Sequence, residues 1–314
     1  MKKPGELKKI LVTGGAGFIG SNLVLTLQEQ CPKGWIVVVD DFRSGHFKNL
    51  VGFRGDVVAA DVSKLDWKAH FGNEKFDAIF HEASITDTTE HDQRLQIHDN
   101  VEGFRRLLEF ARLYETPVVY ASSAAIYGLS SELMNREDQS PQPANVYAFS
   151  KMVLDHLAQK YAHHFLSWQI VGVRYFNVYG PREAHKGKAA SMIHQLAQQI
   201  RANQPPRVFK AGEQKRDFVY IKDAVDATLL GLKAPSGIYN IGSGEPRSFN
   251  EVIAVLQTQL GTHLATEYFD NPYPFYQPHT EADLTKSRKW LKYGPRFSLE
   301  DGIRDYYTSG FLTA

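Results

Sequence analysis

Short apolar runs alternate with amphipathic helical patterns through the first half of the chain. The runs lie at residues 9–13, 35–39, 56–61, 77–81, 117–121 and 169–173, and two long helical patterns span 101–114 and 146–163. Near-continuous apolar runs of this length are typical of strands buried on both faces, and their alternation with helices is typical of a right-handed parallel sheet. The pattern therefore predicts an α/β fold with a doubly wound parallel sheet.

The second half of the chain has a different pattern. From about Asn177 onward turn signals become dense and helices shorter, which predicts a smaller, irregular α/β lobe over the carboxyl ends of the strands. Phe218–Asp223 again has the pattern of a strand followed by a helix start, so the two lobes interleave. We expect a first domain at 1–176, completed by about 217–242, and a mainly substrate-binding lobe at 177–314.

Composition narrows the class of protein. The 314 residues carry a net charge of +1, which gives no reason to expect nucleic acid or an anionic membrane as a partner. The single cysteine, Cys31, cannot form an internal disulfide and is compatible with a reducing compartment. No run approaches the ~18 apolar residues of a membrane span, so we expect a cytoplasmic protein. The 12 histidines are scattered without metal-ligand spacing, so we expect no metal site.

A glycine-rich loop follows the first apolar run. Gly15, Gly17 and Gly20 fit the G-x-G-x-x-G fingerprint, and Gly14 with the last two gives a second matching triplet. Such a loop needs a tight turn, close approach of a pyrophosphate and close helix–strand packing. Free amides at the helix start then meet the phosphates. The loop predicts a Rossmann dinucleotide-binding first domain, with these residues at the cofactor: Gly14, Gly17, Phe18, Ile19 and Gly20.

The residues after the second apolar run bear on the choice of cofactor. Asp40 ends that run, where a carboxylate usually accepts hydrogen bonds from ribose hydroxyls and favours NAD. Arg43 and Lys48 stand where they could neutralise a 2′-phosphate, or could belong to a solvated loop. Asp41 is either a ribose ligand or a turn residue. Asp40 alone favours NAD, but Arg43 and Lys48, together with the family resemblance described below, lead us to predict NADP, with NAD as the alternative.

A second constellation predicts the chemistry. Tyr147 and Lys151 lie one helical turn apart on one face of the predicted 146–163 helix, and Ser123 ends the fifth apolar run. A cation beside a phenol favours the phenolate, so we expect Lys151 to make Tyr147 usable as a base near neutral pH. Ser123 would hydrogen-bond the same substrate oxygen. Together with a dinucleotide loop, these residues predict proton and hydride transfer at a carbinol carbon.

These motifs resemble the extended short-chain dehydrogenase/reductase family over essentially the whole chain. The resemblance rests on Thr13–Gly20, Ser122–Ala124, Tyr147 with Lys151, and Arg174–Arg182. It implies an enzyme that acts on a nucleotide sugar and forms a homo-oligomer. Dehydratases of the family carry an Asp-Glu pair where this chain has Ala124-Ala125, which argues against dehydration. Galactose-type 4-epimerases usually have threonine in place of Ala125, which weakens that alternative.

Within the family the chain is most similar to the ADP-L-glycero-D-manno-heptose 6-epimerases. The similarity rests on His81–Ser84, Asp87–Glu90, Gly180–Ser191 and Lys215–Tyr220. It implies ADP-heptose as the substrate and Lys186 as a second acid/base across the sugar from Tyr147. The sugar-nucleotide contacts that it implies are Ser123, Asn177, Lys186, Ser191, Phe209, Arg216 and Tyr276. The further cofactor contacts that it implies are Asp61, Glu82, Ala83, Ser84 and Asn100.

The chemistry explains why two acid/base groups are needed. A carbon without an acidic proton is inverted by oxidation to a ketone and return of hydride to the other face, and a retained nicotinamide makes this redox-neutral. Lys186 could instead be a phosphate-binding lysine. Two further alternatives are another nucleotide-sugar 4-epimerase and a non-catalytic dinucleotide sensor. The intact Ser123, Tyr147 and Lys151 argue against the sensor.

Overall fold

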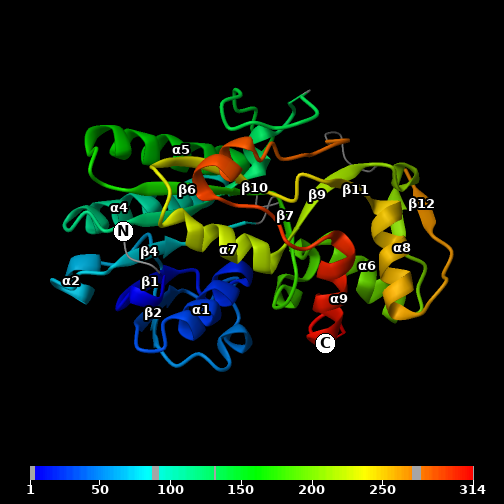
Figure 1. Cartoon of the computed structure of the whole chain (residues 1–314), viewed down its shortest axis with the longest axis horizontal. Coiled ribbons are helices and arrows are strands. Elements are labelled where there is room, and N and C mark those ends of the chain that lie inside the picture. Colours follow the sequence, from blue (N-terminus) through cyan, green and yellow to red (C-terminus); the bar gives the residue numbers. More distant parts are fainter. Residues whose placement is uncertain (1–3, 87–91, 131, 271–276, 314) are drawn as a thin grey trace.

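A seven-stranded parallel sheet forms the centre of the first lobe in the computed structural model, which describes residues 4–86, 92–130, 132–270 and 277–313 (Figure 1). Its strands are β1 (Lys9–Thr13), β2 (Trp35–Asp40), β3 (Asp56–Ala59), β4 (Ala78–His81), β5 (Val118–Ser123), β6 (Ile170–Tyr175) and β10 (Gly237–Ile241). Their order is β10-β6-β5-β4-β1-β2-β3, and every neighbouring pair is parallel. The predicted doubly wound sheet is therefore confirmed.

Helices cover both faces of this sheet because successive side chains of each strand point to opposite faces. Val12 belongs to the core shared with α1 (Phe18–Gln30) and α7 (Ile221–Gly231). Leu11 belongs to the core shared with α2 (Trp67–Phe71), α4 (Gly103–Arg112) and α5 (Val146–His164). Both residues are fully buried. Burial on two faces explains why the strands appear in the sequence as continuous apolar runs.

The predicted helix at 101–114 begins earlier and is not uniform. It is built from α3 (Gln93–Ile97), a π-helical segment η3 (His98–Glu102) and α4. Both Asp99 and Asn100 on the π-helical segment are buried and line the cavity described below. Single π-helical turns occur frequently at functional sites.

The second lobe contains two small sheets and three helices. One sheet has the order β11-β9-β7 and consists of β7 (Asn177–Tyr179), β9 (Lys215–Tyr220) and β11 (Pro246–Ser248). The other pairs β8 (Arg207–Phe209) with β12 (Glu267–Phe269). The helices are α6 (Met192–Arg201), α8 (Phe249–Leu260) and α9 (Leu299–Thr308). A capping box between Ser248 and Glu251 starts α8, which ends at Gly261 in the left-handed conformation.

Short helical turns complete the described structure. They are η1 (Pro4–Glu6), η2 (Phe47–Leu50), η4 (Ala124–Tyr127), η5 (Ala184–Ala189), η6 (Lys210–Gly212) and the π-helical η7 (Ser287–Leu291).

The return of the chain to the first lobe differs from the expectation. The strand predicted at Phe218 is β9, which pairs with β7 and β11 in the small sheet and not with the large one. The helix that follows it, α7, carries the chain back, and β10 then joins the large sheet beside β6. The local hydrophobic pattern predicts the strand and the helix. It does not predict which strands pair with β9, because those strands lie far away in the sequence.

The order of the strands reverses between β1 and β4. From β1 the chain adds β2 and β3 on one side, and from β4 it adds β5, β6 and β10 on the other. In open α/β sheets ligands bind at this reversal, outside the carboxyl ends of the strands. The glycine loop after β1 and the Glu82–Ser84 segment after β4 both lie there.

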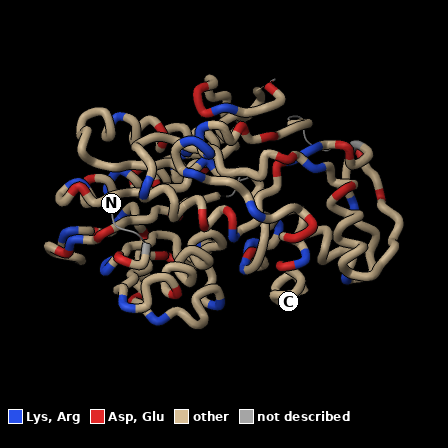
Figure 2. Tube along the Cα trace, in the orientation of Figure 1, with Lys and Arg blue, Asp and Glu red and all other residues tan. Residues whose placement is uncertain are grey.

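Charge distribution, helix length and potential metal ligands are three further features of the described residues. Figure 2 shows Lys and Arg intermixed with Asp and Glu along the trace. Within the described ranges, no helix is long and apolar enough to cross a membrane, and no cluster of three or more potential metal-ligating side chains occurs.

Candidate active site

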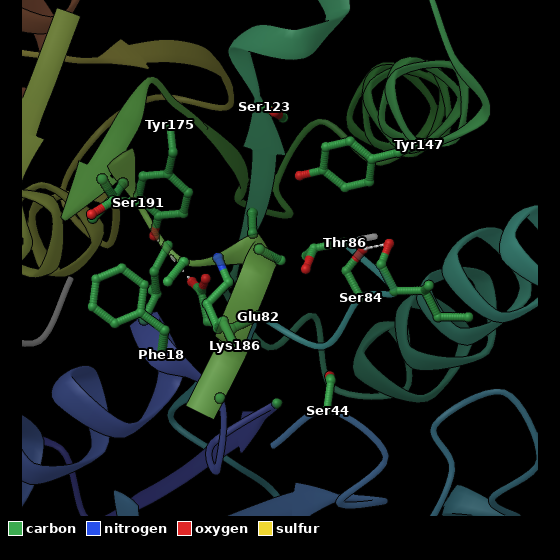
Figure 3. A pocket seen from close by; sticks show the side chains of 18 of the residues that line it. Phe18, Ser44, Glu82, Ser84, Thr86, Ser123, Tyr147, Tyr175, Lys186 and Ser191 are labelled. Carbon is green, nitrogen blue, oxygen red and sulfur yellow. Dashed lines mark hydrogen bonds between the residues drawn. The ribbon is translucent and has the colours of Figure 1, made fainter. Parts of the chain in front are cut away.

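A cavity of about 1240 Å³ lies between the carboxyl edge of the large sheet and the second lobe (Figure 3). Its walls come from both lobes, so one continuous space meets the glycine loop, the Tyr147 helix and the second-lobe strand β8. The predicted site residues that line it are Gly14, Gly17, Phe18, Ile19, Gly20, Asp40, Asp41, Arg43, Asp61, Glu82, Ala83, Ser84, Asn100, Ser123, Tyr147, Lys151, Asn177, Lys186, Ser191, Phe209 and Arg216.

Two of the predicted site residues are not among those that line the cavity. Lys48 lies exposed on η2 and is not among the lining residues. Tyr276 and the Asp87–Glu90 motif lie outside the described residues.

The glycine loop has the close packing that a dinucleotide cradle needs. Gly14 has a φ of +71°, and a Cβ there would lie 2.4 Å from the Ala83 backbone nitrogen. A Cβ on Gly20 would lie 2.1 Å from the Gly14 carbonyl oxygen. The N-cap of α1, Gly17, makes no side-chain capping hydrogen bond, so the first amides of the helix remain for an anion. The loop residues therefore fit a dinucleotide pyrophosphate.

Asp40 is engaged by the protein itself. Its Oδ2 accepts a hydrogen bond from the Ala16 amide at 2.9 Å, and its Oδ1 accepts one from the Phe42 amide at 2.8 Å. Burial raises the pKa of this carboxyl, which is 7% exposed. Asp40 thus ties the glycine loop to the end of β2, and this observed role is added to the ribose contact predicted from the sequence.

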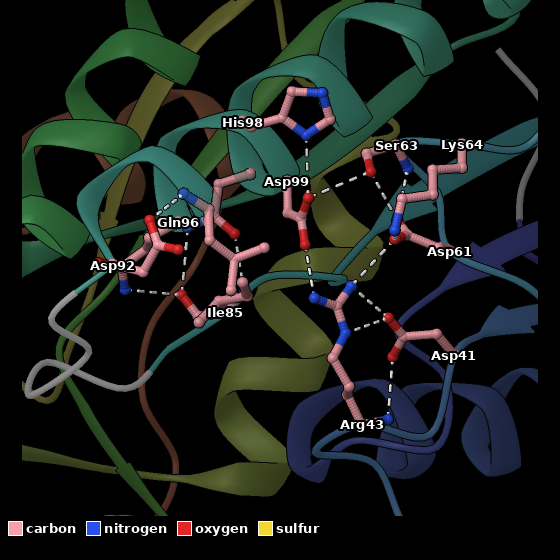
Figure 4. Close-up of polar contacts among 12 residues, drawn as sticks. Asp41, Arg43, Asp61, Ser63, Lys64, Ile85, Asp92, Gln96, His98 and Asp99 are labelled. Atoms are coloured by element: carbon pink, nitrogen blue, oxygen red, sulfur yellow. Dashed lines mark hydrogen bonds and ion pairs between the residues drawn. The ribbon is translucent and has the colours of Figure 1, made fainter.

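Arg43 is held by three carboxylates (Figure 4). Its guanidinium donates to Asp41 Oδ2 at 2.6 Å, to Asp99 Oδ2 at 2.5 Å and to Asp61 Oδ2 at 3.3 Å. Lys64 adds a second cation at 3.0 Å from Asp61. Although burial opposes it, the hydrogen bonds to Asp99 and Asp41 raise the pKa of Arg43 overall.

Of the two cations predicted to meet a 2′-phosphate, Arg43 lines the cavity but is paired with carboxylates, and Lys48 is not among the lining residues. Three carboxylates against two cations leave this ion-pair cluster with one net negative charge. Asp41 belongs to this ion-pair cluster, and its Oδ1 also accepts the Arg43 amide at 3.0 Å in a turn. The sequence could not reveal the decisive partner, Asp99, because it lies 56 residues away on the π-helical segment.

Ser123, Tyr147 and Lys151 meet where β5 ends beside α5, as the sequence predicts. Tyr147 projects into the cavity in Figure 3, and Lys151 Nζ lies 5.9 Å from the centre of its ring. Asn145 caps the helix by accepting the Ala148 amide at 2.8 Å, which fixes the start of α5 just before Tyr147.

The electrostatics of this group differ from the expectation. Burial raises the pKa of the Tyr147 phenol, and although a hydrogen bond with Ser123 lowers it, the charge of Glu82 raises it further. Burial lowers the pKa of Lys151 to about 8. The expected lowering of the Tyr147 pKa by Lys151 is therefore wrong, because desolvation and the charge of Glu82 raise this pKa. Tyr147 keeps its proton at neutral pH in this state.

Lys186 reaches the same cavity from the second lobe. It sits on η5, and its Nζ lies 5.7 Å from the centre of the Phe18 ring on the glycine-loop helix. Burial lowers the pKa of Lys186, opposed by the charge of Glu183. The carboxylate of Glu183 accepts the amides of Gly180 at 3.0 Å and Ser191 at 2.6 Å. It thereby fixes both ends of the loop that carries Lys186.

Comparison with known proteins identifies the family. The model of the NAD dependent epimerase/dehydratase family matches residues 10–242. The chain belongs to this family. An ADP-L-glycero-D-manno-heptose-6-epimerase from Alkalilimnicola ehrlichii is 38% identical over 312 residues, covering 95% of this chain and 96% of that protein.

Solved structures of the family agree with the fold. The crystal structure of Helicobacter pylori ADP-L-glycero-D-manno-heptose-6-epimerase superposes with a TM-score of 0.92 and 42% identity, covering 100% of this chain and 99% of that one. UDP-glucuronic acid 4-epimerase from Bacillus cereus, solved with NAD, superposes with a TM-score of 0.86 and 28% identity, covering 97% and 99%.

The second lobe of this family member supplies the far end of the cavity. Asn177 donates to the Asp217 carbonyl at 3.1 Å, and Ser191 caps α6. Phe209 makes an edge contact with Phe269, whose ring centre lies 5.9 Å away. The residues that complete this end were not predicted from the sequence, and among them only Phe269 is an aromatic residue in a short strand that could have indicated the site. They are Gln195, Gln199, Arg207, Gln214, Phe249 and Phe269.

The remaining lining residues are held by contacts around the end of β4. Asn100 Oδ1 accepts the Ile85 amide at 2.8 Å, and its Nδ2 donates to Ser150 Oγ at 2.9 Å. This pair of contacts fixes the segment that contains Glu82, Ala83 and Ser84. Asp61 accepts from Ser63 in addition to its ion pairs.

The role of Asp40 gives the first prediction. Asp40→Asn leaves one of the two backbone amides facing an NH₂ group, and an unpaired buried donor costs about 1–3 kcal/mol. Urea unfolding should show a loss of this size in the free energy of unfolding. Asp41→Asn is the matched control, since its exposed ion pair contributes at most about 1 kcal/mol. Equal losses in the two variants would contradict the role given to Asp40.

Proposed function

We propose that this protein is an ADP-L-glycero-D-manno-heptose 6-epimerase, which inverts C6 of ADP-glycero-manno-heptose with a bound nicotinamide dinucleotide and no net redox. The observation that carries the proposal is that two acid/base candidates from different lobes, Tyr147 and Lys186, line one cavity. Two relatives named for that activity, aligned over nearly the whole chain, support it.

The dinucleotide would be held by the glycine loop, the start of α1 and the Tyr147–Lys151 helix. When bound, its nicotinamide supplies a reversible hydride acceptor beside the sugar carbon. The Ser123 hydroxyl, at the end of β5, lines the same cavity and would hydrogen-bond the sugar oxygen that Tyr147 serves. The chain's own contribution is to orient the sugar and to handle the proton of its hydroxyl.

The two acid/base groups would serve the two epimers. Tyr147 keeps its proton at neutral pH, so in this state it is set to donate to a sugar oxygen. Burial lowers the pKa of Lys186, so a larger share of its amine is neutral and can accept a proton. After rotation of the intermediate ketone, the oxygen would face the other group. Placing one group on each lobe therefore allows both configurations to be protonated and deprotonated.

The direct test is turnover. Purified protein should convert ADP-D-glycero-D-manno-heptose to its C6 epimer, with UDP-galactose as the comparison substrate for a 4-epimerase. Inversion of UDP-galactose without inversion of the heptose would overturn the proposal.

Tyr147→Phe gives the second prediction. The variant keeps the ring and deletes the proton-transferring oxygen, so turnover should fall by about 10²–10⁴-fold, as is typical of general acid–base groups. Cofactor content should stay unchanged in the purified variant, measured by the absorbance of the released nucleotide. Near-normal turnover in the folded variant would remove Tyr147 from the mechanism.

Lys186→Met gives the third prediction and separates catalysis from phosphate binding. If Lys186 is the second acid/base, kcat should collapse because protons can be exchanged on one side only. Tyr147, Lys151 and Ser123 remain, so an aldehyde analogue of the sugar should still be turned over on that side. If Lys186 only binds phosphate, the variant should instead show a raised KM with nearly intact kcat. The exposed neighbour variant Lys188→Met serves as the charge control.

We also propose that the protein binds NAD in preference to NADP, because of the charged groups around Arg43 that Figure 4 shows. A 2′-phosphate would enter a region with one net negative charge, where Arg43 already pairs with three carboxylates. NADP would bind well only if the phosphate replaced one of these partners. This reverses the choice predicted from the sequence.

Asp41→Asn gives the fourth prediction. It removes one negative charge and the ionic contact of 2.6 Å to Arg43 Nε, so this side of the guanidinium becomes available to a phosphate. The affinity for NADP relative to NAD should rise several-fold, measured by calorimetry with both nucleotides. Lys48→Met, outside the cavity, should leave the ratio unchanged. Tighter binding of NADP than of NAD to the unaltered protein would contradict the preference.

A further inference from the structure

Lys151 is a buried ammonium that needs a negative partner. Its side chain is 1% exposed, and its Nζ donates to the neutral carbonyl oxygen of Ala121 at 2.8 Å. A carbonyl dipole alone compensates a buried charge poorly. Two carboxylates act on Lys151 electrostatically, those of Glu82 and Asp155.

Asp155 is already committed to other groups. It lies one helical turn beyond Lys151 on α5, and its Oδ2 accepts from Arg174 at 2.6 Å and from Ser122 Oγ at 3.0 Å. Its Oδ1 accepts from Tyr120 at 2.9 Å. Arg174 and Asp155 are both about 95% buried and form a closed ion pair. Arg174 therefore offsets the charge of Asp155 and leaves little of it for Lys151.

Among the residues that the structure describes, no Arg or Lys forms an ion pair with Glu82. It follows β4 on the wall of the cavity, and its carboxyl accepts a hydrogen bond from the Tyr175 hydroxyl at 3.1 Å. Figure 3 shows its side chain beside Tyr175 within the cavity. Burial raises the pKa of Glu82 to about 7, and the charge of Lys151 acts in the opposite direction.

A chain of hydroxyl groups behind Glu82 accepts either of its charge states. Tyr175 Oη lies 2.6 Å from Thr228 Oγ1, which lies 2.7 Å from the Ala224 carbonyl oxygen. When Glu82 is ionised, Tyr175 donates to it and Thr228 donates to Tyr175. When Glu82 is protonated, it donates to Tyr175, which donates to Thr228, which donates to Ala224. Both arrangements pair every hydroxyl proton, so Glu82 can titrate without leaving a buried donor unpaired.

We propose that Glu82 is a positioning residue that acts as the counter-ion of Lys151 across the cavity, with Tyr175 and Thr228 holding its carboxyl for this task. Glu82 thereby sets the charge of the ammonium beside Tyr147. The charge assignment concerns the ligand-free chain, and its consequence for catalysis rests on the proposed epimerase function.

The other titratable groups around Glu82 do not replace it. His81, its neighbour on β4, is fully buried, and burial lowers its pKa to about 3, so it is neutral. Tyr147 and Tyr175 keep their protons because burial raises their pKa values. Lys186 draws its electrostatic support from Glu183 instead.

The test is a titration of Lys151 itself. In protein labelled with [ε-¹³C]lysine, the Lys151 signal is the one missing from Lys151→Met, and its midpoint should lie near pH 8. Ionised Glu82 raises the pKa of Lys151, so Glu82→Gln should move that midpoint down by about half a pH unit or more. Glu109→Gln, which removes an exposed carboxylate on α4, should leave it unchanged.

A second variant allows the same test if Glu82→Gln does not fold. Tyr175→Phe removes the donor to ionised Glu82 and should move the Lys151 midpoint in the same direction by a smaller amount. An unchanged midpoint in folded Glu82→Gln, or in Tyr175→Phe should the first variant not fold, would overturn the proposal. These titrations need no substrate, so their outcome is independent of the epimerase assay.

A kinetic measurement then distinguishes an electrostatic role of Glu82 from a purely structural one. The high-pH limb of kcat/KM should move to lower pH in Glu82→Gln, because Lys151 loses its proton earlier. A purely structural role would lower the rate by the same factor at every pH and would overturn the proposal.

Discussion

The close approach of the glycine loop to the end of β4 is the constraint on which the site depends. A Cβ on Gly14 would lie 2.4 Å from the Ala83 nitrogen, so only glycine allows these two segments to meet. Asp40 fixes the loop from its other side by accepting the Ala16 amide. The same approach holds Glu82 at the cavity wall, directly after β4. Cofactor cradle and buried electrostatics therefore follow from one packing contact at the strand-order reversal.

Most of the fold could be predicted from the sequence because its signals are local. Buried strands and the glycine loop give patterns within ten to twenty residues, and Tyr147 with Lys151 lies within one helical turn. What could not be predicted depends on distant partners. One example is the ion pair between Arg43 and Asp99, which lies on the π-helical segment 56 residues away. The pKa of Tyr147 depends on its burial in the folded chain. The partners of β9 are β7 and β11 of the small sheet. Neither feature is visible in the spacing of residues along the sequence.

The interleaved lobes explain how one cavity can hold the two acid/base candidates, Tyr147 and Lys186. The first lobe fixes Tyr147 through a capped helix against the large sheet, and the second lobe carries Lys186 on a loop whose ends are joined by Glu183. Burial acts on the two groups in opposite senses, since it stabilises the protonated phenol and the neutral amine. Two further pairs of opposite charge lie near these groups. Arg174 pairs with Asp155, and in our proposal Glu82 is the counter-ion of Lys151.

The most direct measurement is the fate of the hydrogen on C6 during turnover of ADP-D-glycero-D-manno-heptose in D₂O. Two acid/base groups that handle only the hydroxyl proton leave the carbon-bound hydrogen within the site. The account therefore predicts inversion at C6 with no deuterium at that carbon, observed by mass spectrometry and proton NMR of the product. Deuterium at C6 of the epimerised product would show that a carbon-bound proton exchanges with solvent, and it would contradict the account.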